Sequence, residues 1–346
     1  MTPTPAIWFP TVRTGTGTDV FTERLVAGLQ ARGLRAEITW LPLRAEYAPW
    51  TVPVPPPPTW ANVSHVNTWL HPRFIPSRLP ALATLHHSIH DPALRPYKGC
   101  LRAAYHRSWI APIERRVLHR ADLAVAVSQF VADMAKRTLS KLPMQVIYNG
   151  VDTELFRPGD RVPQQGMPFR LLYVGSWIAR KGVDLLPPIM RALGEGFQLH
   201  YTGGPAAEKD KPSMPSNMHD IGRLNTAQVI VAMQNADAFL FPSRSEGLPL
   251  VAVEAMACGL PVIGTRGTSV AEVVADGCTG LLCQAEEPRD FVQGARRLAV
   301  DAQVGKGMWI AARRHAASNF SFDAMIDSYV QLYRQLTGQR GRRNEL

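Results

Sequence analysis

A glutamate on an otherwise apolar helix is the first feature of this chain that could do chemistry. The helix is expected within residues 241–259, because Pro249 suits a helix start and a glycine follows its end. Every residue from Pro249 to that glycine is apolar or small, except Glu254. A helix apolar on all faces is buried, and a buried carboxylate needs a partner to keep its charge. Glu254 therefore predicts either an arginine partner, Arg244 or Arg266, or a ligand that donates hydrogen bonds.

A second glutamate, Glu246, precedes Glu254 by eight residues. On one helix, this spacing would separate the two by about 12 Å along the axis. Glycosidase carboxylates lie roughly 5–9.5 Å apart, so the spacing disfavours a hydrolytic acid/base pair. It favours two carboxylates that hold two parts of one long ligand. Free amides at the helix start would suit a phosphate between them. The residues around those amides are Gly247, Leu248, Leu250 and Val251.

The elements that must position these residues alternate between strands and helices in both halves of the chain. Apolar runs predict strands at residues 6–9, 36–41, 63–67, 81–85, 123–127, 145–148, 169–174, 197–202, 238–241 and 261–264. Helices are expected at residues 20–31 and 183–193, each after a glycine-containing loop. The pattern predicts an α/β protein with two facing, Rossmann-like doubly wound domains. Ligands bind such sheets at the carboxyl ends of strands, so the active site is expected in the interdomain cleft.

The length of 346 residues agrees with two domains. We expect an N-terminal Rossmann-like domain over residues 1–152, a polar linker over 153–168 and a C-terminal Rossmann-like domain over 169–346. A C-terminal helix at about 322–337 is expected to cross back to the first domain.

Composition excludes several classes of protein. Apolar residues make up 46% and charged residues 19%, which argues against a disordered chain. Four cysteines without a CxxC pair favour a reduced, cytoplasmic compartment. Neither a signal peptide nor a run of about 18 apolar residues is evident, so no membrane span is expected.

Positive charge is concentrated in the first half. Residues 1–150 carry 17 Lys and Arg against 8 Asp and Glu, a net charge of +9, whereas residues 151–346 carry 21 against 20. Residues 101–118 mix arginines with aromatic and aliphatic side chains, a pattern typical of an interfacial helix. An anionic membrane surface or a phosphorylated small molecule is favoured over a plainly solvated helix or nucleic acid.

Several motifs occur in the order of one enzyme family. The pattern Glu246-x7-Glu254, followed by Ala-Met-Ala-x-Gly-x-Pro-Val, resembles the signature of family 4 of the retaining glycosyltransferases, which have the GT-B fold. The other matching pieces are Thr84-Leu-His86, residues 121–128, 147–152, 174–182, 221–222, 236–243 and 262–282. The similarity spans about residues 6–333. It implies that the N-terminal domain binds the acceptor and that the C-terminal domain binds the nucleotide sugar.

The resemblance implies roles for individual residues. Glu254 would bind the ribose of a nucleotide sugar, and Glu246 would orient the sugar hydroxyls and diphosphate together with the amides after Gly247. Lys181 would neutralise the leaving diphosphate, as a catalytic residue. The remaining implied contacts are the base pocket at Ile221 and Gly222, the close backbone approach at Gly17, and His86 facing the transferred sugar.

The chain departs from the family pattern in the loop before Lys181. The family often has Gly-Arg where this chain has Gly175-Ser176, and an arginine stands instead at Arg180. Either Arg180 supplies the second positive charge, or Ser176 donates a hydrogen bond and Lys181 acts alone. In the first glycine loop, the common Gly-Gly is Thr16-Gly17.

The resemblance implies an enzyme without a cofactor and usually without a metal. The histidines at residues 86–90 could form a zinc site, but a role in the catalytic pocket or simple loop packing is preferred.

We therefore expect a retaining transferase that moves a sugar from a nucleotide donor to a saccharide or lipid-linked acceptor. Surface polysaccharide, lipopolysaccharide or glycolipid synthesis is the expected setting, in the cytoplasm or at the inner membrane face, without nucleic acid as a partner. A nucleotide-sugar epimerase, an inverting transferase or a non-catalytic nucleotide-sugar-binding subunit remain alternatives.

Overall fold

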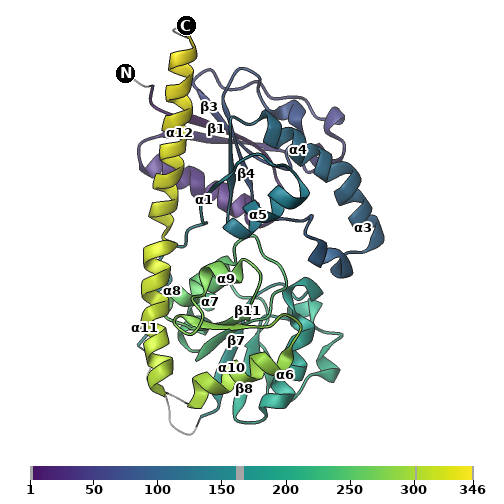
Figure 1. Ribbon diagram of the computed structural model, residues 1–346, viewed down its shortest axis with the longest axis vertical. Coiled ribbons are helices and arrows are strands. Elements are labelled where there is room, and N and C mark those ends of the chain that lie inside the picture. Colours follow the sequence, from purple (N-terminus) through teal and green to yellow (C-terminus); the bar gives the residue numbers. More distant parts are fainter. Residues whose placement is uncertain (1–2, 161–166, 301, 345–346) are drawn as a thin grey trace. The chain divides into compact units, whose positions relative to one another are not determined.

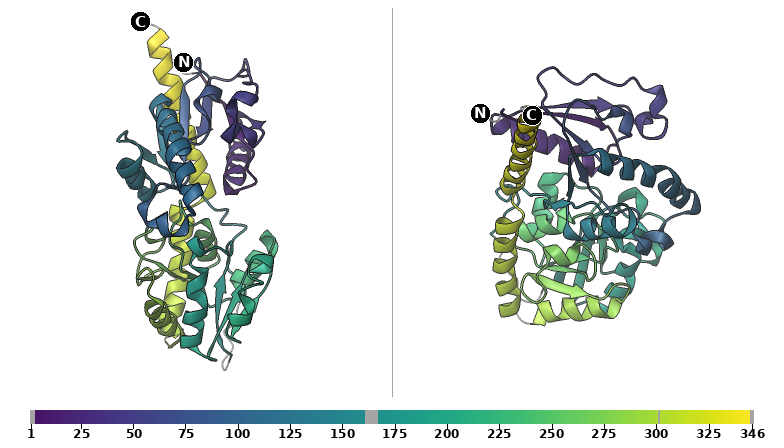
Figure 2. Two further views of the ribbon diagram at one scale, coloured as in Figure 1. Left: turned by 90° about the vertical axis from the view of Figure 1, so that its right-hand side faces the viewer. Right: turned by 45° about the horizontal axis from the view of Figure 1, so that its top comes forward.

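The chain folds into two compact α/β units. The computed structural model describes residues 3–160, 167–300 and 302–344 (Figure 1). One unit comprises residues 1–148 together with 323–346, and the other comprises residues 149–322. Each unit contains a six-stranded parallel sheet, and Figures 1 and 2 show helices on both faces of each sheet.

The sheet of the first unit has the strand order β2-β1-β3-β4-β5-β6. Its strands are β1 (Ala6–Val12), β2 (Arg35–Leu41), β3 (Val63–Asn67), β4 (Ala81–Leu85), β5 (Leu123–Ala126) and β6 (Gln145–Val146). The central strands β3 and β4 are buried along almost their whole length, as is typical of parallel strands covered on both faces. The pairing places the carboxyl ends of β1, β3 and β4 at one edge of the sheet.

The helices of the first unit are α1 (Gly17–Ala31), α2 (Arg44–Tyr47), α3 (Cys100–Tyr105), α4 (Ala111–Arg120), α5 (Gln129–Thr138) and α12 (Phe322–Asn344). A π-helical turn, His106–Ile110, joins α3 to α4, so residues 100–120 form one helix with a widened turn in its middle. Helix α12 begins one residue before the boundary between the units. In the described parts of the chain, no helix combines the length and apolarity needed to cross a membrane.

Helix α12 is anchored to the first unit by buried aromatic and polar side chains. Tyr329 and Tyr333 are fully buried. The Tyr333 hydroxyl lies 2.6 Å from Nδ1 of His65 on β3, and Nε2 of His65 lies 2.7 Å from Oγ1 of Thr84 on β4. Burial lowers the pKa of His65 to about 3, with a smaller effect from His86, so its imidazole is neutral. The last helix is therefore an integral part of the first unit.

The second unit repeats the doubly wound pattern, with strand order β12-β11-β10-β7-β8-β9. Its strands are β7 (Phe169–Tyr173), β8 (Phe197–Tyr201), β9 (Met218–Asp220), β10 (Ala238–Phe241), β11 (Val262–Thr265) and β12 (Gly280–Cys283). Its helices are α6 (Leu186–Leu193), α7 (Thr226–Gln234), α8 (Leu250–Ala257), α9 (Val270–Val273), α10 (Pro288–Val300) and α11 (Ala302–Asn319). Because all pairings are parallel, the loops after β7, β8, β9 and β10 leave one edge of the sheet.

The boundary between the units lies earlier than the sequence predicts. Residues 149–152 belong to the second unit, because Val151 pairs with Ser321 and its amide donates to the Phe320 carbonyl at 2.8 Å. Within the predicted linker, residues 153–160 and 167–168 also belong to this unit, whereas 161–166 lie outside the described residues. Arg313 of α11 donates to the Thr153 carbonyl at 2.6 Å.

The anchoring of α12 yields a stability prediction. Tyr333→Phe removes the hydroxyl beside Nδ1 of His65, which then stays buried without that partner. We expect the free energy of unfolding to fall by about 1–3 kcal/mol. Urea unfolding followed by tryptophan fluorescence measures this, because six of the eight tryptophans lie in residues 1–148. The control Tyr47→Phe, at a side chain 56% exposed, should have no effect. Equal stability of both variants would contradict the proposed anchoring role.

Candidate functional site

Two loops at the carboxyl edge of the second sheet touch through a glycine. Gly182, after β7, has φ +71°, and a Cβ placed on it would lie 2.0 Å from the carbonyl oxygen of Pro242, after β10. The Arg244 amide also donates to the Arg180 carbonyl at 3.0 Å. This close approach places Lys181 beside Glu246.

Glu246 is the centre of a charged cluster. Its side chain is buried, and the residue is 7% exposed. The Lys181 Nζ lies 2.6 Å from its Oε1, and the Ser243 hydroxyl donates to the same oxygen at 2.5 Å. Burial by itself would raise the pKa of Glu246. The charges of Lys181 and Arg180, with the hydrogen bonds from Lys181 and Ser243, outweigh burial and lower the pKa below its usual value. Glu246 is therefore a stable carboxylate that holds Lys181 in place.

Arg180 belongs to the same cluster. Its guanidinium donates to the Ser245 carbonyl at 2.6 Å and lies 3.9 Å from Oε2 of Glu246. Ser176, the alternative to Arg180, is exposed, and its carbonyl accepts a hydrogen bond from the Tyr173 hydroxyl at 3.1 Å. The structure thus brings Arg180, rather than the Ser176 side chain, to Lys181 and Glu246. With two cations and one anion, the cluster has a net positive charge, which suits a phosphate.

The loop at Gly175 is held by a pair of hydrogen bonds to Thr202, which directly follows β8. The Gly175 amide donates to Oγ1 of Thr202 at 2.9 Å, and the Thr202 hydroxyl donates to the Gly175 carbonyl at 3.1 Å.

Helix α8 begins directly after Pro249, as predicted. Glu254 on this helix is not buried, contrary to the prediction. Gly247 and Leu248 are buried before the helix, whereas Leu250, Val251 and Glu254 are half-buried. The expectation of a buried Glu254 is wrong, because the small and apolar neighbours in the sequence do not cover every face of this short helix.

The arginines suggested as partners of Glu254 form ion pairs with other residues. Arg244 pairs with Asp184 at 2.6 Å and with Glu286 at 2.5 Å. Arg266 pairs with Asp276 at 2.5 Å. Both arginines therefore form close ion pairs with carboxylates other than Glu254.

Asp220, at the end of β9, is a site residue that the sequence analysis missed. Its Oδ1 accepts from the amides of Gly203 at 3.0 Å, Gly204 at 3.2 Å and Gly222 at 2.9 Å. Burial opposes the charge on Asp220, but these amides and Lys211 lower its pKa. Asp220 fixes the turn that carries Ile221 and Gly222, both half-buried. The signal in the sequence is an aspartate at a strand end followed by Ile221-Gly222, together with the Gly203-Gly204 pair after the preceding strand.

The first glycine loop lies in the first unit and differs in detail from the prediction. Gly17 begins α1 and is exposed, and a Cβ there would meet no atom within 4 Å. The residue whose backbone requires glycine is Gly15, with φ +70°. Its amide donates to Oδ2 of Asp19 at 2.7 Å, as does the Thr14 amide at 2.9 Å.

His86, also in the first unit, is fixed between β3 and α1. Its Nε2 donates to Oδ1 of Asn67 at 2.9 Å, and its ring lies edge-on to Phe21 at 4.6 Å. Burial lowers the pKa of His86 to about 4, so the imidazole is neutral. His90 contacts a different residue, Glu114, with 2.6 Å between its Nε2 and the Glu114 Oε2. Across residues 3–160, 167–300 and 302–344, no three potential metal ligands converge.

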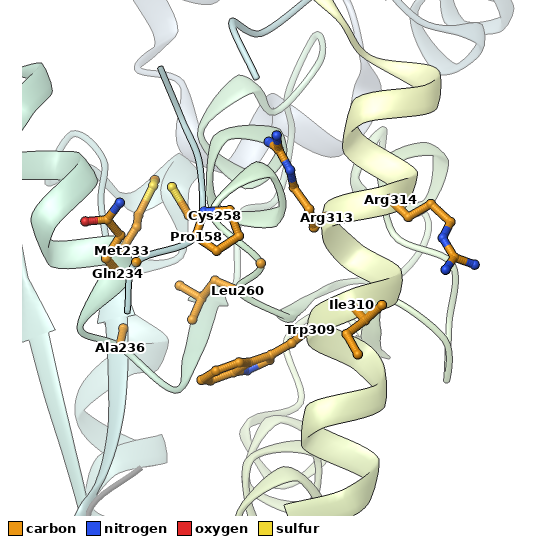
Figure 3. A pocket seen from close by; sticks show the side chains of 12 residues that line it. Pro158, Met233, Gln234, Ala236, Cys258, Leu260, Trp309, Ile310, Arg313 and Arg314 are labelled. Atoms are coloured by element: carbon orange, nitrogen blue, oxygen red, sulfur yellow. The ribbon is translucent and has the colours of Figure 1, made fainter. Parts of the chain in front are cut away.

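A pocket of about 370 Å³ lies elsewhere on the second unit, among the ends of α7 and α8 and one face of α11. In Figure 3, Trp309 reaches from α11 toward Leu260, whereas Arg314 points away. None of the predicted site residues lines this pocket. Burial raises the pKa of the Cys258 thiol in its wall to about 12, so this thiol is a poor nucleophile.

The contact at Gly182 predicts an unusually sensitive position. Gly182→Ala combines a positive φ with a clash against the Pro242 carbonyl, so the two loops must separate. Gly194→Ala is the matched control, because Gly194 has φ +77° and open space around its Cβ position. The control should lose about 1–3 kcal/mol of stability from its backbone conformation alone. Thermal unfolding should show a clearly larger loss for Gly182→Ala, and equal losses would contradict the close contact.

Comparisons with known proteins agree with this architecture. The model of "Glycosyltransferase Family 4" matches residues 59–155, and that of "Glycosyl transferases group 1" matches residues 168–301. D-inositol 3-phosphate glycosyltransferase 1 from Catenulispora acidiphila is 30% identical in an alignment of 259 positions that covers 66% of this chain. The match covers 61% of that relative's length.

Solved structures share the whole fold. Sucrose-phosphate synthase from Thermosynechococcus elongatus superimposes with a TM-score of 0.78 at 20% identity, covering 96% of this chain and 99% of that one. HepE from Anabaena, solved in complex with UDP, gives a TM-score of 0.72 at 16% identity, covering 94% and 99%. The chain has the GT-B fold and belongs to family 4 of the glycosyltransferases.

Proposed function

We propose that this protein transfers a sugar from a nucleoside diphosphate to a saccharide or lipid-linked acceptor, with retention of the anomeric configuration. The observation that carries the proposal is the cluster of Lys181, Arg180 and Glu246 at the carboxyl edge of the second sheet. Within this cluster, Glu246 lies four residues before α8, in the chain segment that leads to Glu254. Doubly wound sheets bind nucleotides at this edge.

The donor's parts match groups along this edge. The diphosphate fits the two cations and the amides of Gly247 and Leu248, because both stabilise negative charge. Glu254 on α8 suits the ribose hydroxyls, since a carboxylate accepts two hydrogen bonds from a diol. Ile221 and Gly222, on the turn that Asp220 fixes, suit contact with the base of the nucleotide. HepE was solved with UDP and with UDP-glucose, which makes UDP the first nucleotide to test here.

The proposed chemistry needs positive charge rather than a protein nucleophile. The bond from the anomeric carbon to the diphosphate breaks, and the acceptor oxygen forms its bond on the same face of the sugar. The acceptor's proton passes to the departing phosphate oxygen. Lys181 and Arg180 stabilise the charge that develops on that phosphate. Glu246 keeps Lys181 oriented beforehand, so little reorganisation is needed. We propose that neither a metal nor a cofactor takes part.

We assign the acceptor to the first unit, where the excess of positive charge lies. Trp50, 66% exposed, and Leu101, 90% exposed, add apolar surface to this basic unit. Such a surface suits peripheral contact with anionic lipid. We therefore propose a role in the assembly of a surface polysaccharide, lipopolysaccharide or glycolipid at a membrane face.

Two measurements test the proposed function. Thermal shift with UDP, GDP and ADP should identify one nucleoside diphosphate that raises the melting temperature. Transfer from the corresponding α-linked sugar nucleotide, followed by proton NMR, should give an α-linked product. A β-linked product would show an inverting transferase instead. Binding without transfer or donor hydrolysis would show a non-catalytic subunit, and an epimerised donor would show an epimerase.

Lys181→Ala should lower kcat about 10²-fold or more, by loss of one preorganised charge-stabilising donor. The substitution also leaves Glu246 buried beside Arg180 alone, so Lys181→Arg is included and should recover part of the activity. The control is Lys306→Ala, at an exposed lysine of α11, which should keep the wild-type rate. Near wild-type turnover in Lys181→Ala would count heavily against the proposal.

Glu254→Ala should weaken binding of the nucleotide, because charge-assisted hydrogen bonds are worth about 1.5–3 kcal/mol. We expect the Kd for the nucleoside diphosphate to rise about tenfold or more in calorimetric titration. Glu195→Ala removes an exposed carboxylate near the start of β8, at the opposite edge of the same sheet, and should leave the Kd unchanged. An unchanged Kd in Glu254→Ala would assign that carboxylate a structural role instead.

A further inference from the structure

Arg244, in the loop after β10, binds two other loops at the carboxyl edge of the second sheet. Its guanidinium donates to both carboxylate oxygens of Asp184, between β7 and α6, at 2.6 and 2.8 Å. It also donates to both oxygens of Glu286, between β12 and α10, at 2.5 and 2.6 Å. A further hydrogen bond reaches the carbonyl of Ala179, in the same loop as Asp184. These contacts use all five N–H donors that an arginine side chain has.

The contacts of Arg244 hold the chain on both sides of Lys181. On one side, the backbone amide of Arg244 donates to the carbonyl of Arg180 at 3.0 Å. On the other side, its guanidinium holds Asp184, three residues after the lysine. Arg244 therefore fixes the backbone from which the lysine side chain extends, whereas Glu246 holds the ammonium at its tip, at 2.6 Å.

The backbone at Glu286 is strained. Its φ is +61°, and in the described parts of the chain no other residue except glycines has a positive φ. A side chain makes this left-handed conformation costly, and it persists only where the surrounding contacts over-determine it. The two hydrogen bonds from Arg244 are such contacts. Because strained positions of this kind cluster at functional sites, the pairing of Glu286 with Arg244 points to a role beyond folding.

The guanidinium of Arg244 is covered by its two carboxylate partners. The side chain of Arg244 is 6% exposed, whereas those of Asp184 and Glu286 are 55% and 49% exposed. The hydrogen bonds from Arg244 lower the pKa of Asp184 below its usual value, although partial burial opposes this. Asp184 is therefore a stable carboxylate. A lysine in place of Arg244 would supply the charge but not the planar fork that meets two carboxylates side by side.

We propose that Arg244 is a positioning residue that holds Lys181 in place for the departure of the donor's diphosphate. The inference rests on the proposed function, since it explains how Lys181 is kept oriented for that reaction. Arg244 fixes the backbone at the base of the lysine side chain, and Glu246 fixes its ammonium. A preorganised cation stabilises developing charge without rearranging, and a displacement of about 1 Å can lower a rate about 10²-fold. Arg244 thus acts on the reaction through Lys181 rather than through contact with the sugar nucleotide.

The first test is Arg244→Lys, which keeps one positive charge between the two carboxylates but loses the planar fork. Turnover is measured as nucleoside diphosphate released from UDP-glucose, GDP-glucose or ADP-glucose, according to which nucleoside diphosphate raises the melting temperature. Water is the acceptor: its oxygen bonds to the anomeric carbon as the bond to the diphosphate breaks, and one of its protons passes to the diphosphate. We expect kcat to fall about tenfold or more, with a much smaller change in KM, because the lost interaction acts on the departing phosphate.

Counting active sites separates this effect from a folding defect. Calorimetric titration with the same nucleoside diphosphate gives the number of binding sites per chain, and kcat is expressed per site. The matched control is Arg32→Lys, which removes a fork that binds Asp323 and Asp327 in the first unit. The control should keep the wild-type kcat. An unchanged kcat per site in Arg244→Lys would overturn the inference.

A double-mutant cycle separates positioning of Lys181 from a merely structural role. If Arg244 acts through Lys181, Arg244→Lys should lower kcat clearly less in the Lys181→Ala background than in the wild type. Two independent effects would instead multiply. The same fold loss of kcat in both backgrounds would therefore overturn the inference.

Glu286→Gly keeps the test decisive if Arg244→Lys folds poorly. It removes one carboxylate partner of Arg244, while glycine adopts the positive φ without strain. The melting temperature should stay close to that of the wild type, whereas kcat per site should fall, by less than in Arg244→Lys because Asp184 remains. A wild-type kcat per site in Glu286→Gly would count against the inference in the same way.

The wild-type protein separates this inference from the proposed function. If it binds a nucleoside diphosphate and hydrolyses the donor while the Arg244 and Glu286 variants match its kcat, only the positioning role is overturned. If the wild type neither binds a nucleotide nor hydrolyses a donor, the proposed function is overturned, and this inference with it.

Discussion

The contact between a buried carboxylate and a lysine determines much of the organisation of the second unit. Glu246 lies almost out of contact with water, so its charge persists only because Lys181, Arg180 and Ser243 surround it. Removing one partner of a buried ion pair typically costs about 3–5 kcal/mol, because the other charge stays behind in a medium of low dielectric constant. The pair therefore constrains the loop after β7 and the loop after β10 together. If either loop moved far, the charge of Lys181 or Glu246 would become exposed to water or would stay buried without its partner.

Each loop at this edge is fixed by a different physical device. The loop after β7 relies on the absence of a side chain at Gly182, which lets backbone meet backbone. The turn after β9 is held by Asp220, whose carboxylate accepts hydrogen bonds from three backbone amides. In the first unit, Asp19 holds the first glycine loop in a similar way. Rigid loops of this kind suit a site that must stabilise charge without rearranging.

Much of the fold could be predicted from the sequence, because parallel strands buried on both faces read as continuous apolar runs. The strands at residues 63–67, 81–85 and 238–241 have the predicted bounds. The short strands β9 and β12 were not predicted, since their sequences, Met-His-Asp and Gly-Leu-Leu-Cys, contain no β-branched or aromatic residue. The GT-B fold and the family could be inferred because the motifs occur in order along the chain, which is a property of sequence rather than of packing.

Features that depend on tertiary contacts could not be predicted in the same way. The exposure of Glu254 depends on which neighbours cover α8, and no spacing reveals this. The conformation that requires Gly15 rather than Gly17 depends on the bonds to Asp19. Lys181 and Glu246 were singled out separately. Their 2.6 Å contact follows only from the approach of two loops that are more than sixty residues apart in the chain.

The docking of α12 has a consequence for the order in which the protein assembles. The first unit combines residues 1–148 with residues 323–346, so its polypeptide is interrupted by the whole of the second unit. During synthesis on the ribosome, residues 149–322 emerge before the helix that carries Tyr329 and Tyr333. The second unit can therefore reach its native state while the first still lacks its final layer. Until that helix is synthesised, His65 and the apolar surface around it remain uncovered, so the first unit completes its fold only after the second unit has been made.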